Sequence, residues 1–278
     1  MLKPVLSSGL DRAAHLRTDQ EALNGLMAVP STRVLRVFDG RFAWESDSKE
    51  SVNLFFLGLD EANIAYFANH QNHAELADAY SLRDSNWPYL DQSIATYAVA
   101  LTNWHATHQR CSRCGGDTEP ILAGAARRCL VEGIDLYPRS DPAVIISVLD
   151  RDDRLLLGRQ KVWPENKFSA FAGFVEPGES LEACVRRELM EECGVEIETV
   201  AYLGSQAWPF PASLMVAFQA IAENPLQARP DGIEIEEIKW FTRDELLRSY
   251  LSKEVLLPPR ISIARRMIEH WYGTELHR

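Results

Sequence analysis

Short apolar runs separated by turn residues dominate the first hundred residues of the chain. Two of these runs span Arg33 to Phe38 and Val52 to Leu59. Runs of this length between polar turns are typical of strands, so we expect a mostly β N-terminal region. Between residues 91 and 109 the apolar positions recur at helical spacing behind a cap at Asp91 or Ser93. We expect a helix there, and it leads into a cysteine-containing segment.

The second half of the chain predicts strands and one sharply bounded helix. Residues 142–158 hold two apolar runs around a polar turn at residues 150–153, which predicts a hairpin. Further on, Gly178 comes just before a helix start at Ser180, and Gly194 comes just after the helix end. This placement of capping residue and glycine is expected of a capped helix.

One face of this helix changes from apolar to acidic along its length. At 100° per residue the apolar stripe consists of Leu181, Cys184 and Val185. The same face continues as three glutamates, Glu188, Glu191 and Glu192. Carboxylates at this spacing repel one another, so they either shift their pKa values or bind a cation. The alternative is a solvated acidic patch, but continuation of a buried stripe favours a cation site.

Composition limits the classes of protein. The chain has 278 residues, 46% of them hydrophobic and 25% charged, with a formal net charge of −11. These values exclude disordered and fibrous classes and argue against sequence-blind binding of nucleic acid, which needs clustered Lys and Arg. No apolar stretch approaches the roughly 20 residues of a membrane span, and the first residues do not resemble a signal peptide. We expect a cytoplasmic protein with no membrane partner.

The acidic helix carries a resemblance to a known family. Residues 173–195 match the Nudix box, G-x5-E-x7-R-E-U-x-E-E-x-G-U with U apolar, at Gly173, Glu179, Arg187, Glu188, Leu189, Glu191, Glu192, Gly194 and Val195. The resemblance implies an α/β/α sandwich that hydrolyses a nucleoside diphosphate linked to another moiety, with Mg²⁺ or Mn²⁺ as cofactor. It also implies a close approach of the backbone at Gly173.

The resemblance and the chemistry of carboxylates assign the catalytic roles. Glu188 and Glu192, one helical turn apart, are the first-choice metal ligands, and Glu191 shares ligation or takes the proton. By resemblance, Arg187 orients the box through an ion pair with Glu179 or a neighbouring carboxylate. The resemblance adds two further metal contacts, the carbonyl of Ala172 and the carboxylate of Glu234. Glu234 is also explained as the solvent side of an alternating strand.

A second motif narrows the substrate. Residues 205–213, SQAWPFPAS, resemble the S-Q-P-W-P-F-P-x-S signature of the NADH pyrophosphatase branch, with Ala207 in place of a proline. Flat bases stack on aromatic faces such as those this loop offers, although Trp208 and Phe210 are also explained by packing beneath the turn. The resemblance assigns substrate contacts to Arg83, Tyr137, Phe174, Gln206, Ala207, Trp208, Pro209, Phe210, Pro211, Ala212, Ser213 and Ala264.

The cysteine segment resembles the zinc ribbon of the same branch. Cys111, Cys114 and Cys129 follow the spacing C-x2-C-x14-C-x2-C, but Glu132 stands in the fourth position. Structural zinc strongly favours Cys and His. Glu132 completes a weaker site, His105 or His108 substitutes, or the ribbon holds together without metal. Of these we favour a ribbon without zinc, particularly if residues 121–126 pack apolar surface of their own. The other two cysteines, Cys184 and Cys193, are expected in the core.

These observations predict three parts and one activity. We expect a mixed, mostly β domain over residues 1–105, a zinc-ribbon-like segment over 106–138 and a Nudix hydrolase domain over 139–278. The resemblance implies a homodimer that hydrolyses NAD(H) to NMN(H) and AMP and removes 5′ NAD caps from RNA. Five arginines are candidates to meet the RNA phosphates: Arg110, Arg113, Arg127, Arg128 and Arg139. Alternatives are hydrolysis of ADP-ribose or another nucleoside diphosphate derivative, a nucleotide sensor that does not cut, and a zinc-ribbon interaction module.

Overall fold

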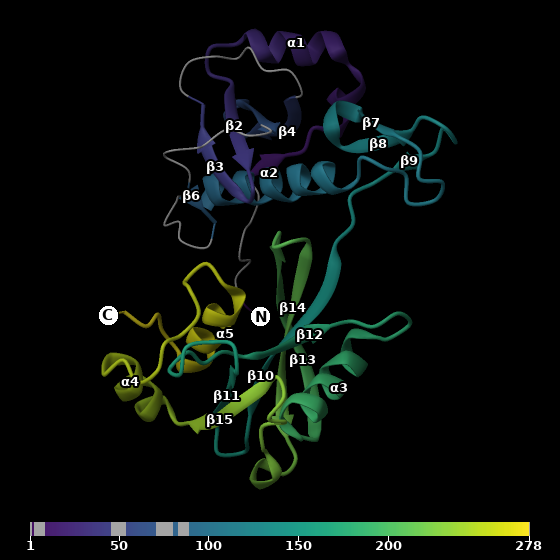
Figure 1. The fold of residues 1–278 in the computed structure, drawn as a ribbon. Coiled ribbons are helices and arrows are strands. Elements are labelled where there is room, and N and C mark those ends of the chain that lie inside the picture. Colours follow the sequence, from purple (N-terminus) through teal and green to yellow (C-terminus); the bar gives the residue numbers. More distant parts are fainter. Residues whose placement is uncertain (1, 3–8, 46–53, 71–79, 83–88, 278) are drawn as a thin grey trace. The chain divides into compact units, whose positions relative to one another are not determined.

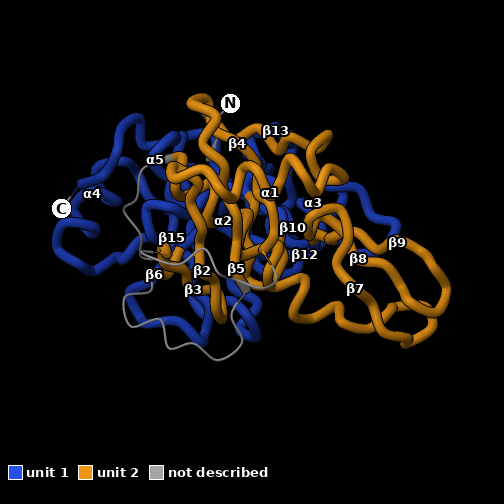
Figure 2. Tube along the Cα trace, turned by 90° about the horizontal axis from the view of Figure 1, so that it is seen from above, with its two compact units in different colours: residues 1–5, 141–206, 214–278 blue, residues 6–140, 207–213 orange. Residues whose placement is uncertain are grey.

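The computed structural model describes residues 2, 9–45, 54–70, 80–82 and 89–277. Its two compact units are shown in separate colours in Figure 2. Unit 1 consists of residues 1–5, 141–206 and 214–278, and unit 2 of residues 6–140 and 207–213. The segment 207–213 therefore belongs to a different unit from its neighbours in the sequence. Most helices and strands are labelled in Figure 1.

A six-stranded sheet forms the centre of unit 2. Its strands are β1 (Leu10–Asp11), β2 (Arg33–Phe38), β3 (Arg41–Trp44), β4 (Leu54–Asp60), β5 (Ala65–His70) and β6 (Tyr80–Ser81). Their order is β1-β4-β5-β2-β3-β6, in which β2 and β5 run parallel. The expected mostly β N-terminal region is confirmed, and β2 and β4 follow the two apolar runs identified in the sequence.

Helices cover the two faces of this sheet. The helices of this part are the 3-10 helix η1 (Ala14–Thr18), α1 (Gln20–Ala28) and α2 (Tyr89–Thr107). Ile94 and Ala98 of α2 pack on Leu35 of β2, while Leu23 of α1 packs with Phe56 of β4 on the other face. Because the side chains of a strand alternate between faces, the two helices bury separate cores.

Helix α2 is confirmed, but the predicted cap is wrong. The helix begins at Tyr89, so Asp91 and Ser93 lie inside its first turns. The Asp91 carboxylate pairs with Arg33 across 3.6 Å, and Ser93 is buried. Both polar residues are therefore used in packing α2 against the sheet.

A small three-stranded antiparallel sheet, the ribbon, follows α2. Its elements are β7 (Thr118–Ile121), the 3-10 helix η2 (Leu122–Gly124), β8 (Ala126–Cys129) and β9 (Asp135–Leu136). Gly124 is buried against Phe55 of β4, where a Cβ atom would lie 2.4 Å from the ring. The segment 121–126 thus does pack apolar surface of its own.

Unit 1 is built on a second sheet of six strands. They are β10 (Asp141–Leu149), β11 (Leu155–Gln160), β12 (Phe171–Phe174), β13 (Ile197–Trp208), β14 (Ser213–Ala222) and β15 (Ile235–Phe241). The order is β13-β14-β10-β11-β15, and β12 pairs with β10. The predicted hairpin is confirmed by β10 and β11, which pair through Val148 and Leu156 around the turn at residues 150–153.

Helices lie on both sides of this second sheet. The helices of unit 1 are α3 (Leu181–Cys193), the 3-10 helix η3 (Pro225–Gln227), α4 (Arg243–Leu251) and α5 (Ile263–Tyr272). Leu156 of β11 faces the core that α3 covers, whereas its neighbours Leu155 and Leu157 face the core that α4 and α5 cover. This alternation produces the expected α/β/α sandwich, visible in Figure 1. Among the described residues, none of the helices has the length and apolar character required to span a bilayer.

Candidate active site

Local sequence signals position α3. The Ser180 hydroxyl accepts a hydrogen bond from the Ala183 amide at 3.1 Å, and Gly194 ends the helix with φ +64°. Between these ends Cys184, Val185, Leu189 and Cys193 are fully buried. The predicted bounds of the helix and the core positions of both cysteines are confirmed. The acidic end of the helix is thereby held next to β12.

Gly173 on β12 lies directly beneath the carboxyl group of Glu188. A Cβ atom at this position would be 1.8 Å from Glu188 Cδ. Any other residue would displace the carboxylate, so the expected close backbone approach is confirmed. Burial raises the pKa of Glu188, although Arg187 acts in the opposite direction.

Arg187 links three carboxylates of the box. Its guanidinium binds Glu179 through two hydrogen bonds of 2.9 Å, and its Nη1 lies 2.9 Å from both Glu188 Oε1 and Glu191 Oε2. Nη2 also donates to the carbonyl of Phe174 at 2.9 Å. Together with the Glu176 amide, Arg187 lowers the pKa of Glu179 to about 2. The expected ion pair with Glu179 is confirmed, and it ties α3 to the end of β12.

Glu192 is the buried carboxylate of the helix. The residue is 4% exposed, and its Oε2 has no hydrogen-bond partner. Burial, together with the charges of Glu234, Glu188 and Asp231, raises its pKa to about 8, against a hydrogen bond from the Ala172 backbone. An unpaired buried carboxylate oxygen among other carboxylates is costly unless a cation offsets the charge.

Glu234 and Asp231 add negative charge beside Glu192. Glu234 is exposed and precedes β15 rather than lying on it, and its Oε1 accepts from Gln160 at 3.0 Å. The Asp231 carboxylate accepts from the amides of Glu234 and Ile235 at 3.1 and 2.8 Å. Sequence reasoning did not identify Asp231. Its only signal is the Pro-Asp-Gly turn, which predicts a bend and not a site.

Glu191 differs from the expectation that all three glutamates face inward. Its side chain is 58% exposed and contacts Arg187. At 100° per residue Glu191 lies roughly 120° around the helix from Val185, whereas Leu189 and Glu192 stay within about 40° of it. The buried stripe therefore passes through Leu189 and leaves Glu191 at the solvent edge.

The carboxylate set fits a hard divalent cation. Glu188 and Glu192 lie on one face of α3, Glu234 acts on both through its charge, and the Ala172 backbone is in hydrogen-bond contact with Glu192. Oxygen donors of this kind suit Mg²⁺ and Mn²⁺. The orphaned Oε2 of Glu192 is the observation that favours a cation, because nothing else described in the chain satisfies it.

The SQAWPFPAS segment begins in unit 1 and continues into unit 2. Trp208 and Phe210 are both half-buried, and their rings meet edge to face at 5.3 Å. Phe210 packs on the core beneath α2, and the Pro209 carbonyl accepts from Asn103 of α2 at 3.2 Å. Phe210 therefore serves in part as a packing residue, which is the alternative explanation given above for the aromatics of this loop. Ala207 and Pro211 are exposed, and Ala212 is half-buried.

Gln206 makes contacts within unit 1. Its amide donates to the Ile261 carbonyl at 2.8 Å and accepts from the Ile263 amide at 2.7 Å. Gln206 thus fixes the start of α5, where Ala264 is buried. Ser213 is also buried, at the start of β14. These three positions are held within the protein and are less accessible than the sequence suggested.

Two predicted aromatic contacts are exposed, and one predicted arginine lies outside the described residues. Tyr137 follows β9 and is 52% exposed, and Phe174 at the end of β12 is 58% exposed. Each presents a ring face to which a base or nicotinamide can stack. Arg83 falls among the residues that the structure does not describe.

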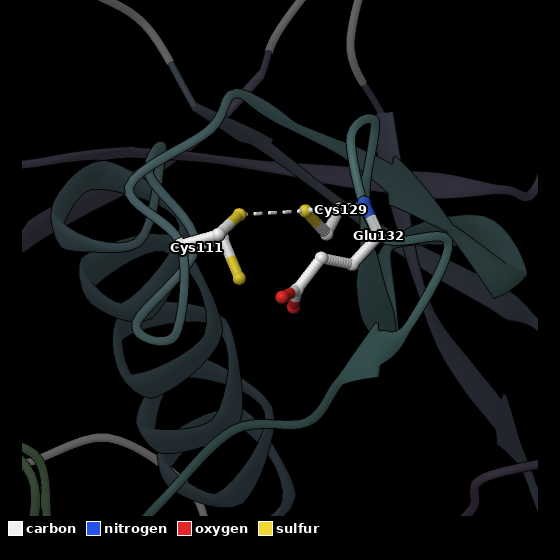
Figure 3. A group of neighbouring side chains, drawn as sticks. Cys111, Cys129 and Glu132 are labelled. Carbon is white, nitrogen blue, oxygen red and sulfur yellow. Dashed lines mark hydrogen bonds between the residues drawn. The ribbon is translucent and has the colours of Figure 1, made fainter.

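The predicted zinc-ribbon donors converge in unit 2. Four residues each offer one donor atom, and these atoms lie within 4.8 Å of one another: Cys111, Cys114, Cys129 and Glu132. Figure 3 labels three of these side chains, which point toward a common space. His105 does not substitute for the fourth cysteine, because its two ring nitrogens bond to Gly124 O and to Arg127 at 2.8 Å each. The Nδ1 atom of His108, the other predicted substitute, contacts the Trp104 carbonyl at 3.1 Å and is thus also engaged within the protein.

The arginines near the ribbon are mostly engaged with the protein. Arg127 is 7% exposed and bonds to Thr118 and His105, so its expected contact with RNA phosphates is wrong. Arg110 pairs with Asp117 at 2.9 Å, and Arg128 with Asp135 at 2.8 Å. Three of the five arginines, Arg110, Arg113 and Arg128, therefore form ion pairs within the protein.

Two family models match the chain. The model described as NUDIX domain matches residues 139–260, and the model described as NADH pyrophosphatase zinc ribbon domain matches residues 106–132. The zinc-ribbon match and the convergent donors do not confirm the expectation of a metal-free ribbon.

Full-length relatives support the same grouping. NAD-capped RNA hydrolase NudC of Mycobacterium tuberculosis is 40% identical over 299 aligned positions, which cover 98% of this chain and 96% of that protein. NAD(P)H pyrophosphatase NUDT13, mitochondrial, of Mus musculus is 34% identical and covers 98% and 82%. Among solved structures, a NUDIX hydrolase from Nitrosomonas europaea aligns with a TM-score of 0.45 at 22% identity, covering 61% of this chain and 96% of that one.

Proposed function

The chain belongs to the Nudix hydrolases, in the branch that carries an NADH pyrophosphatase zinc ribbon, and from this premise we propose that it hydrolyses the diphosphate bond of NAD(H). The products are NMN(H) and AMP. The same reaction on RNA removes a 5′ NAD cap. The observation that carries the proposal is the buried Glu192, whose free oxygen lies among the carboxylates of the Nudix box.

Charge is the main obstacle to this reaction. The negative oxygens of a diphosphate repel the attacking water. In the transition state, further negative charge spreads over the oxygens of the phosphoryl group that is attacked. Mg²⁺ or Mn²⁺ held by the carboxylates would supply the positive charge that neutralises these oxygens and that activates the attacking water. We assign the ligands to Glu188, Glu192, Glu234 and the Ala172 carbonyl.

The remaining residues of the Nudix box hold the carboxylates in place and accept the proton. Arg187 holds Glu179, Glu188 and Glu191 in one network, which fixes the carboxylates before the substrate binds. We assign acceptance of the proton of the attacking water to Glu191, which is exposed beside this network. Gly173 leaves the space that the Glu188 carboxylate fills.

Substrate recognition is assigned to aromatic faces. Trp208 and Phe210 are the candidates within the SQAWPFPAS loop, and Tyr137 and Phe174 are exposed candidates outside it. A nucleotide with a flat ring at each end of one diphosphate has two surfaces for stacking, worth about 1–3 kcal/mol each. Gln206 acts by positioning α5, and we keep Ala264, Ser213 and Arg83 as candidate contacts.

Two other functions are less well supported. ADP-ribose lacks one of the two flat rings, so the aromatic loop favours a dinucleotide over it. A sensor that binds without cutting does not require the costly burial of Glu192 beside Glu188 and Glu234. We further propose a homodimeric, cytoplasmic protein with domains over 1–105, 106–138 and 139–278, on the strength of the resemblance.

Incubation with a panel of substrates tests this function. Purified protein is given NADH, NAD⁺, ADP-ribose or NAD-capped RNA at one Mn²⁺ concentration, and the products are identified by mass. We expect AMP together with NMN(H) from the free dinucleotides, and NMN with 5′-phosphorylated RNA from the capped transcript. If none of the NAD-containing substrates is cut while ADP-ribose is, the second candidate replaces the first.

A further inference from the structure

Two short turns of the ribbon have the same construction. The first covers Cys111 to Gly115 and the second Cys129 to Gly133. In each turn the glycine amide donates to the carbonyl of the cysteine four residues earlier at 2.9 Å, and the glycine has a positive φ, +73° and +70° respectively. Glu132 in the second turn therefore occupies the position that Cys114 has in the first.

Backbone amides in both turns also point at the sulfur atoms. The Arg113 amide donates to Cys111 Sγ at 3.4 Å, the Gly116 amide to Cys114 Sγ at 3.4 Å, and the Glu132 amide to Cys129 Sγ at 3.3 Å. Donors aimed at sulfur stabilise thiolates, the form that binds metal. The turns are thus prepared for ligation at three of their four donor positions.

The spacing of the donors matches a tetrahedral site. Ligands about 2.3 Å from a central zinc stand about 3.8 Å apart. Cys114 Sγ and Cys129 Sγ are 3.5 Å apart, and all four donor atoms lie within 4.8 Å (Figure 3). Among the residues that the structure describes, this is the one group of three or more such donors that converges so closely.

Apart from Cys111 and Cys129, the residues of these two turns are exposed. Gly124 and Ala126 are buried at the far end of β7 and β8, but beside the sulfur atoms Leu130 and Val131 are 58% and 72% exposed. The packing that favoured a metal-free ribbon therefore holds one end only. The end that carries the cysteines needs another link between its two turns.

We infer that Glu132 is the fourth ligand of a structural zinc ion, in a site of three thiolates and one carboxylate. A carboxylate carries the same charge as the thiolate it replaces, so the zinc site keeps the net charge of a four-cysteine ribbon. Arg113 Nε lies 3.7 Å from Glu132 Oε2 and orients the carboxylate, leaving the other oxygen for the metal. Because oxygen is a harder donor than sulfur, this zinc exchanges faster than in a four-cysteine site.

Metal binding by the full-length protein tests the inference. Reduced protein is assayed with excess Mg²⁺, which occupies the carboxylate site of unit 1, and zinc is measured by elemental analysis and by competition with a chromophoric chelator. We expect one zinc per wild-type chain. E132Q should lower zinc affinity by at least the roughly 10–100-fold that loss of an outer-shell partner costs. E119Q, at an exposed glutamate of β7, is the matched control and should leave it unchanged.

Cobalt reports the number of thiolates directly. Its thiolate charge-transfer band counts the metal–sulfur bonds, so E132C, with four thiolates against three, should raise the band by about a third and strengthen zinc binding. Wild-type protein without zinc, E132Q with wild-type affinity, or E132C with an unchanged band would overturn the assignment. None of these outcomes bears on NAD(H) hydrolysis, which is assigned to other residues.

Discussion

Replacing Glu192 with Gln should stabilise the metal-free protein at high pH. In the folded chain the pKa of Glu192 is raised from the ordinary value of 4.5 to about 8, first by burial and then by the charges of Glu234, Glu188 and Asp231. Between these two values the folded state binds a proton that the unfolded state has released. The stability of the wild-type protein therefore falls as pH rises from about 5 through about 8.

The structure gives the size of this effect. Each pKa unit corresponds to about 1.36 kcal/mol, so the full shift sets an upper bound of about 5 kcal/mol above pH 8. Local relaxation and water entry reduce the penalty of a buried charge, and we expect about 2–4 kcal/mol. Gln has nearly the same shape and no charge, so E192Q should escape the penalty.

Chemical denaturation in the presence of EDTA measures the difference. At pH 9 the free energy of unfolding of E192Q should exceed that of the wild type by the amount above, and near pH 5 the two should agree within about 1 kcal/mol. Added Mg²⁺ should reduce the difference at pH 9, because the cation stabilises the wild-type site. E182Q, at an exposed residue of the same helix, is the control and should follow the wild type. An E192Q protein equally stable at pH 9, or offset by the same amount at both pH values, would refute the reasoning.

Three further substitutions test other contacts. G173A places a Cβ atom on the Glu188 carboxyl group and should lower stability by about 1–3 kcal/mol and reduce turnover, as measured by denaturation and by product release; normal values of both would contradict the contact. W208A should raise KM for NADH by roughly 5–150-fold, the equivalent of one lost stacking contact, with a smaller change in kcat, and an unchanged KM would remove Trp208 from the binding site. R127A should destabilise the ribbon, since it removes the hydrogen bonds of the guanidinium to Thr118 and His105, yet leave the salt dependence of capped-RNA cleavage unchanged. A shallower salt dependence would show that this buried arginine does reach RNA phosphates.

Local signals in the sequence predicted the elements whose ends are marked by local chemistry. Ser180 and Gly194 bound α3 because a hydroxyl cap and a left-handed glycine act within one turn of the chain. The hairpin of β10 and β11 was predicted because the polar turn at residues 150–153 lies directly between its two apolar runs. Helix α1 was missed, since Gly25 in its middle disfavours a helix and Leu23 is its one buried residue, so the sequence signal is weak.

Contacts between distant segments were predicted less well. Asp231 joins the acidic group through a turn about 40 residues beyond α3, and nothing near it in the sequence announces that role. The assignment of 207–213 to unit 2 depends on packing of Phe210 against the core under α2. The predicted cap at Asp91 or Ser93 was wrong because the helix already begins at Tyr89, and the Asp91 carboxylate pairs with Arg33 of a separate strand. In each case the deciding partner is remote in sequence.

Glu132 shows how a departure from a motif can be interpreted only with coordinates. In the sequence it stands where a fourth cysteine is expected, which argues against zinc. In the structure the equivalent hydrogen bonds at Gly115 and Gly133 place it in the same geometry as Cys114. The spacing of the motif predicted the position, and the backbone determines what a carboxylate can do there.

The rate of NADH hydrolysis by wild type, E192Q and E182Q, each with Mn²⁺, tests the central claim most directly. We expect wild type and E182Q to release AMP and NMNH at similar kcat/KM, and E192Q to lose about 10²–10⁴-fold, the range typical of removing one catalytic group. Circular dichroism confirms that each variant is folded. Near wild-type release of AMP by folded E192Q, or no AMP from the wild type, would contradict the account.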